Sequence, residues 1–82
     1  MEVGVKDLDN PPNAFILQTN PDAGIPGFPT GIGGNTALVI QLFPGRDTFA
    51  AQLAVGFRHD RLAIRRKYDS PNWSAWKYFT AS

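Results

Sequence analysis

The residues best equipped for chemistry in this sequence are aromatic side chains close to its C-terminal end. Trp73, Trp76, Tyr78 and Phe79 all lie in the stretch DSPNWSAWKYF, residues 69–79. Aromatic rings of this kind can form an exposed platform on which sugars stack, or they can fill a small core, where each buries about 150–250 Å². Because a small β domain needs such anchors, the sequence favours a structural role for Trp73, Trp76 and Tyr78.

A run of basic residues precedes this aromatic stretch, and one of its arginines is expected to be buried. Alternate residues of a strand share a face, which puts Arg66 in phase with Leu62 and Ile64. A buried guanidinium must be paired or stacked, and its planar group stacks well on an indole. The phase therefore predicts that Arg66 is structural and ties its strand to Trp73.

Two further arginines of this run, Arg61 and Arg65, are predicted to point outward. Their side chains would then form a solvated face that protects an edge strand from pairing. The alternative is that they contact a ligand.

The sequence gives little support for a catalytic site or a metal site. His59 is the only histidine, whereas a metal site usually needs two or three ligands and a nucleophilic triad needs a base and an orienting group. Asp47, Asp60 and Asp69 fall at predicted turns, where aspartate makes local hydrogen bonds. The Gly-rich stretch is not followed by a helix, so it is not a phosphate-binding loop. We expect no enzyme activity, no cofactor and no metal.

The Gly/Pro-rich stretch between residues 19 and 36 is the candidate binding loop. Loops longer than about 12–15 residues are uncommon in compact domains and are often binding loops or disordered segments. The alternative is a packed surface loop pinned by Ile25, Phe28 and Ile32. If the domain binds a host glycan, the expected contacts are loop residues together with the two outward arginines: Asn20, Asp22, Phe28, Thr30, Asn35, Arg61 and Arg65.

Length and composition limit what must position these residues. Eighty-two residues make one domain at most, without cysteines to stabilise it, and a domain of this size is marginally stable by itself. The formal net charge of +1 argues against nucleic acid or an anionic membrane as a partner. No apolar run approaches a membrane span, and the start lacks a signal peptide. We therefore expect a soluble protein made in a cytoplasm.

The hydrophobic pattern is β throughout. It predicts an all-β fold, a small antiparallel sheet or sandwich of about five strands with one long Gly/Pro-rich loop. Residues 1–6 are expected to be a linker or the end of a preceding module, and residues 7–82 the domain. The nearly continuous apolar run at 36–43 suggests a strand covered on both faces. The strands are expected at residues 14–19, 36–43, 49–57, 61–68 and 76–81.

The strand FAAQLAVGF has the clearest alternation. Its large apolar residues share one face, and its small side chains share the other together with Gln52. The small face is the candidate for close contact, with another strand or with a neighbouring protomer. It consists of Ala50, Gln52, Ala54 and Gly56.

The closing WSAW, the preceding Arg66 and the strand with Gln52 together resemble the pyocin-knob type of domain, found in tail fibres of R-type pyocins and tailed phages. The resemblance runs from DLDN at residues 7–10, through the Gly/Pro-rich loop and the strand TALVIQLF, to Phe79. It departs from the family pattern at residues 13–15, Asn-Ala-Phe, where the family usually has Gly followed by an aromatic.

The resemblance implies a structural or receptor-binding module of a homotrimeric tail fibre, located in the virion or tail particle. Its partners would be two other copies of the chain, other tail-fibre domains and host surface polysaccharide. Two other classes remain open. A stand-alone carbohydrate-binding module would expose Trp73 and Trp76 as a coplanar pair, and a depolymerase fragment would hold two carboxylates across a cleft.

Overall fold

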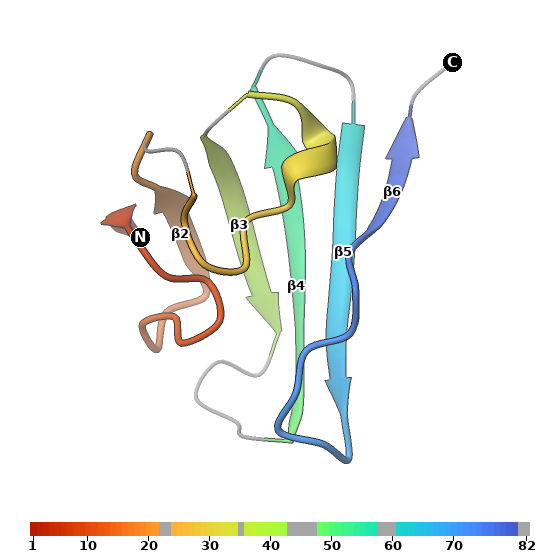
Figure 1. The fold of residues 1–82 in the computed structure, drawn as a ribbon. Coiled ribbons are helices and arrows are strands. Elements are labelled where there is room, and N and C mark those ends of the chain that lie inside the picture. Colours follow the sequence, from red (N-terminus) through yellow and green to blue (C-terminus); the bar gives the residue numbers. More distant parts are fainter. Residues whose placement is uncertain (22–23, 35, 43–47, 58–60, 81–82) are drawn as a thin grey trace.

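The computed structural model describes residues 1–21, 24–34, 36–42, 48–57 and 61–80. Those residues form a single six-stranded sheet and one short 3₁₀ helix (Figure 1), and none of them builds a helix long and apolar enough to cross a membrane. The all-β prediction is confirmed. The elements are β1 (Glu2–Val5), β2 (Ile16–Thr19), η1 (Thr30–Ile32), β3 (Ala37–Leu42), β4 (Phe49–Gly56), β5 (Arg61–Tyr68) and β6 (Lys77–Thr80).

The strands lie in the sheet in chain order, and every neighbouring pair except β1 and β2 is antiparallel. The parallel pair distinguishes the sheet from the fully antiparallel one expected. Residues 2–5, which the sequence pattern assigned to a linker, are the edge strand of the sheet. A parallel pair needs a crossover connection, and residues 6–15 supply it.

One face of the sheet is covered by loops and not by a second sheet. Figure 1 shows the crossover, the loop that contains η1 and the segment before β6 on the same side of the strands. Ile25 and Ile32 are buried and Phe28 packs against the core. The interpretation of residues 20–35 as a packed loop is therefore confirmed for these three residues. We call this side the covered face.

Small residues on the covered face allow the loops to approach the backbone of the sheet. Ala54 and Ala63 are fully buried in the core with Val39. At Gly56, a Cβ atom would lie 3.3 Å from the side chain and the carbonyl oxygen of Ile32. The small side of β4 thus makes its close contact within the chain, with the loop.

The opposite side of the sheet, the open face, carries mostly large apolar residues and no described part of the chain covers it. The strand registers place the side chains of the strands alternately on the two sides. Every residue on this side is exposed or half-buried. Its members are Val3, Ile16, Gln18, Leu38, Ile40, Leu42, Phe49, Ala51, Leu53, Val55, Leu62, Ile64, Arg66, Tyr68, Lys77 and Phe79.

Two predictions about which residues are buried are wrong. The strand at 36–43 was expected to be covered on both faces, but Ile40 and Leu42 are exposed. In β5 the phase is reversed, because Ala63 and Arg65 are buried whereas Leu62 and Ile64 are exposed. The physical reason is that loops cover β4 and β5 closely, so the inner side chains of these two strands are small or polar and their large apolar groups lie outside.

Candidate functional site

The side chain of Arg65, in the middle of the covered face, contacts several other described residues. Arg65 is only 5% exposed. Its Nε donates to Gln52 Oε1 at 2.7 Å and its Nη2 to the carbonyl oxygen of Leu8 at 2.7 Å. Its Nη1 forms a hydrogen-bonded ion pair with Asp9 at 3.0 Å. The guanidinium therefore joins β4, β5 and the crossover.

Two indoles enclose the same guanidinium. The Cζ atom of Arg65 lies 4.5 Å from the ring centroid of Trp73 and 4.7 Å from that of Trp76, both within cation–π range. The ring N–H groups are also used, because Trp73 donates to the carbonyl oxygen of Asp9 at 3.2 Å and Trp76 to that of Gly27 at 2.7 Å. We call Arg65, Gln52, Asp9, Trp73 and Trp76 the arginine cluster.

Short local motifs hold the cluster in place. Asp7 Oδ1 accepts the backbone N–H groups of Asp9 and Asn10, a turn that aspartate favours. Ser74 hydrogen-bonds to the backbone of Arg66 twice, as its N–H donates to the carbonyl oxygen and its hydroxyl accepts the N–H. The serine of WSAW thus fixes the segment beside β5, which lets the tryptophans on either side reach Arg65.

A chain of amides extends the cluster across the sheet. Gln52 Nε2 donates to Leu8 O and to Gln41 Oε1, and Gln41 Nε2 donates to the carbonyl oxygens of Pro12 and Ala14. Loop carbonyl groups that lie over a sheet find no strand partner, and a buried carbonyl without a donor is costly. Among the described residues, no buried side-chain nitrogen or oxygen lacks a partner.

The chemistry of Arg65 is that of a fixed structural cation. Burial lowers its pKa, which the hydrogen bond to Asp9 and the charges of Asp9 and Asp7 oppose. Arginine nevertheless stays protonated in proteins. Its Nε, Nη1 and Nη2 atoms each donate to a protein oxygen, and its planar group contacts two indoles. The arginine cluster therefore holds the loops on the sheet.

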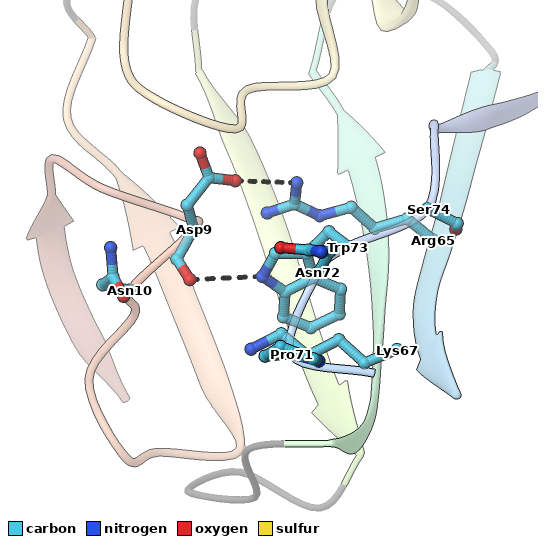
Figure 2. Close-up of a pocket in the computed structure, with 8 residues that line it drawn as sticks. All are labelled: Asp9, Asn10, Arg65, Lys67, Pro71, Asn72, Trp73 and Ser74. Atoms are coloured by element: carbon cyan, nitrogen blue, oxygen red, sulfur yellow. Dashed lines mark hydrogen bonds and ion pairs between the residues drawn. The ribbon is translucent and has the colours of Figure 1, made fainter. Parts of the chain in front are cut away.

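An open pocket of about 420 Å³ lies beside the arginine cluster (Figure 2). Asp9 and Asn10 from the crossover line it, together with Lys67 of β5 and residues 71–74. Lys67 Nζ is 4.7 Å from the ring centroid of Trp73, and Figure 2 shows this indole between the side chains of Arg65 and Lys67. Trp73 is therefore a wall of the pocket with both faces occupied.

The structure exchanges the roles predicted for the two neighbouring arginines. Arg66, expected to be buried against Trp73, is exposed on the open face, and Arg65, expected to point outward, is the buried one. Because strand residues alternate, one wrong choice of face reverses both assignments. Gln52, Trp73 and Trp76 do meet, but around Arg65.

Tyr78 has a different contact from the other aromatics. A Cβ atom added to Gly31 would lie 2.6 Å from its ring, so the phenol packs directly on the backbone of η1. Tyr78 itself is 40% exposed.

The predicted ligand contacts of the long loop do not gather at the pocket. Phe28 packs against the core, Thr30 is exposed at the start of η1, and Asn20 donates its backbone N–H to the carbonyl oxygen of Val5. Arg61 Nη1 donates to the carbonyl oxygen of Gly31 at 2.9 Å. Asp22 and Asn35 lie outside the described residues.

Of the aspartates expected at turns, the structure describes Asp69. Asp69 is exposed at a turn with φ 51°, a backbone conformation that aspartate tolerates better than most residues. His59, Asp47 and Asp60 lie outside the described residues. Within the described part of the chain, no group of three histidine, cysteine or carboxylate side chains could hold a metal ion.

Asp9, Asn10, Lys67 and Asn72 line the pocket and were not among the ligand contacts predicted from the sequence. The available signal was the alternation of β5, in which Ala63, Arg65 and Lys67 share a face with the small side of β4. Had that small side been taken as the covered one, Arg65 would have been placed beneath the tryptophans. Comparison of the chain with protein-family models, characterised proteins and solved structures found no match.

Proposed function

We propose that this domain is a structural and receptor-binding module of a phage or pyocin-like tail fibre, which assembles as a homotrimer through its open face. The observation that supports it best is the open face itself. With about 3.3 Å per strand residue and about 4.8 Å between strands, the sheet spans on the order of 500 Å². That is within the range of about 300–600 Å² for the largest apolar patch of a typical monomer, which is often functional.

This apolar surface is better buried against other copies of the chain than left in contact with water. The domain has 82 residues and no cysteine, so burial between chains would supply stability that a domain of this size lacks. The open face has Arg66 and Lys77 as its only charged members, both at the β5–β6 side. The rest is nearly uniform and apolar, as obligate interfaces between identical subunits tend to be.

The number of subunits is taken from the resemblance to pyocin-knob domains. Three sheets can place their open faces around one threefold axis and close the assembly. Two sheets can instead stack as a sandwich about 10 Å apart, so a dimer is the competing arrangement. In a fibre the domain would adjoin other tail-fibre domains in the particle and present the covered face, with its loops, to the host surface.

Light scattering coupled to size-exclusion chromatography tests this proposal. We expect a species of three times the chain mass of 9.0 kDa. Leu53, in the middle of the open face, pairs with Ile40 and Ile64. The variant Leu53→Lys should give monomers, because a charge at the centre of an apolar interface disrupts association.

A matched variant on the other side of the molecule controls for the added charge. Thr30→Lys places the same side chain on an exposed residue of η1 and should leave the trimer intact. A wild-type chain that stays monomeric at millimolar concentration would contradict the proposal, and a dimer would replace the threefold arrangement with a sandwich.

A further inference from the structure

The pocket beside the arginine cluster has the size of a binding site. Its volume of about 420 Å³ falls within the range of about 300–1,000 Å³ that is usual for ligand sites. Three separate parts of the chain converge on it, namely the crossover, β5 and the segment before β6 (Figure 2). Most of the residues that line it are polar, which argues against an apolar ligand.

The wall of the pocket is rigid. Trp73 is held by its hydrogen bond to Asp9 O and by the guanidinium of Arg65. Asp9 is held in turn by its ion pair with Arg65 and by the turn at Asp7. A site of fixed geometry loses little entropy when a ligand binds.

Several polar groups around this wall are not used inside the described part of the chain. The side-chain amides of Asn10 and Asn72 make no hydrogen bond to other described residues. The side chain of Asp9 is 46% exposed, and its ion pair engages only Oδ1. These groups offer both donors and acceptors, the combination that sugar hydroxyl groups require.

The charge of the site selects an anion. Arg65 and Asp9 neutralise each other, whereas Lys67 pairs with no carboxylate among the described residues and lies on the Trp73 ring. Among the described residues that line the pocket, Lys67 thus has the one positive charge without a carboxylate partner. An anionic group that drew Lys67 away would uncover one face of the indole.

We propose that this pocket binds an anionic saccharide unit, whose carboxylate or phosphate pairs with Lys67 and whose hydroxyl groups contact Asn10, Asn72 and Asp9. The sugar ring then packs on the indole face that Lys67 leaves. This inference rests on the proposed attachment function and gives it a ligand class. It places the contacts beside WSAW, apart from the long loop.

Binding is measured on the wild-type chain by calorimetry and by tryptophan fluorescence with three probes: an oligogalacturonate, mannose 6-phosphate and neutral maltotriose. We expect the anionic probes to bind and to change the Trp73 emission, and affinity to fall with added salt. The preferred anionic probe distinguishes carboxylate from phosphate. If neither anionic probe binds at millimolar concentration, or if maltotriose binds equally well, the proposal is wrong.

Matched lysine variants locate the contact. Lys67→Gln should weaken binding of the anionic probe about tenfold, the effect of losing a charged hydrogen bond. Lys6→Gln, at an exposed lysine outside the pocket, should leave it unchanged. Asn72→Ala, in an exposed segment, provides a second variant that should weaken binding without unfolding the domain. Equal affinities of wild type, Lys67→Gln and Asn72→Ala would overturn the assignment.

The oligomeric state separates this inference from the proposed function. A trimer that binds no anionic saccharide would keep the fibre module and remove the site. A monomer that binds it through Lys67 would keep the site and remove the fibre assembly.

Discussion

The two faces of the sheet differ in the side chains they carry and in what covers these side chains. On the covered face, β4 and β5 contribute alanines, Gln52 and Arg65, β2 and β3 add Leu17, Val39 and Gln41, and loops close over them. On the open face the strands contribute large apolar residues that the described chain leaves exposed or half-buried. In β4 and β5 the large apolar side chains are thus the ones that no described part of the chain covers.

The difference follows from what covers each face. A loop brings carbonyl groups that have no strand partner, and these need donors from the sheet. The buried donors of the covered face supply them, as Gln52 and Arg65 both donate to Leu8 O. A second sheet brings no unpaired carbonyl groups into the interface, so an apolar face is suited to that kind of neighbour.

The largest expected effect comes from the buried cation. Arg65→Met keeps the length of the side chain but removes the partner of Asp9 and the donor to Leu8 O. Asp9 is 46% exposed and keeps water as a partner, so the cost comes from the buried Gln52 Oε1 that loses its donor, about 1–3 kcal/mol, and from the lost cation–π contacts with two indoles, about 0.5–1 kcal/mol each. The sum is a large part of the total of about 5–15 kcal/mol for a domain. Urea unfolding followed by circular dichroism should show this loss.

The neighbouring residue is the matched control for that variant. Arg66→Met makes the same substitution on the exposed, open face and should change the free energy of unfolding by less than about 0.5 kcal/mol. Both variants should be measured at the same low protein concentration, so that association contributes equally to the two free energies of unfolding. Similar losses for the two variants would show that the faces do not differ as described.

A smaller effect is expected at the buried amide of β4. Gln52→Leu leaves the Nε of Arg65 and the amide oxygen of Gln41 without their partners. An unsatisfied buried group costs about 1–3 kcal/mol. Gln18→Leu, on the open face, should be neutral or stabilising, since it extends an apolar surface. A comparison of the two thermal midpoints checks the sign, and a stabilised Gln52→Leu chain would contradict the role of the network.

The strands could be predicted from the sequence, because alternation and turn residues set them locally. The expected ranges at 36–43, 49–57 and 61–68 overlap β3, β4 and β5. Strand β1 was missed, as its four residues contain a glycine at φ 75° and an irregular register with β2. Both features weaken the alternating pattern from which strands are recognised.

The choice of face could not be predicted from alternation alone, and the site depended on it. Hydrophobicity predicts that Leu62 and Ile64 point inward, which would place Arg66 inside and Arg65 outside. In β5 the pattern fixes which residues share a face but not which face the loops cover. Asp9, over fifty residues away in the sequence, reaches Arg65 only through that covering, so no local signal marked it.

The smallest expected effect on stability concerns an aromatic pair on the open face. Phe49 and Tyr68 pair across β4 and β5 in an edge-to-face arrangement, with ring centroids 5.7 Å apart and planes at 81°. Such a pair contributes about 0.5–1.5 kcal/mol beyond its burial, and exposure places this one at the low end. A double-mutant cycle with Phe49→Ala and Tyr68→Ala, measured in the monomeric Leu53→Lys background, isolates the coupling.

If the open face is an interface, the same cycle in the wild-type trimer should give a larger coupling, because burial between chains removes water from both rings. An equal coupling in the two backgrounds would mean that this end of the open face stays exposed in the assembly, and would restrict the interface to the centre around Leu53.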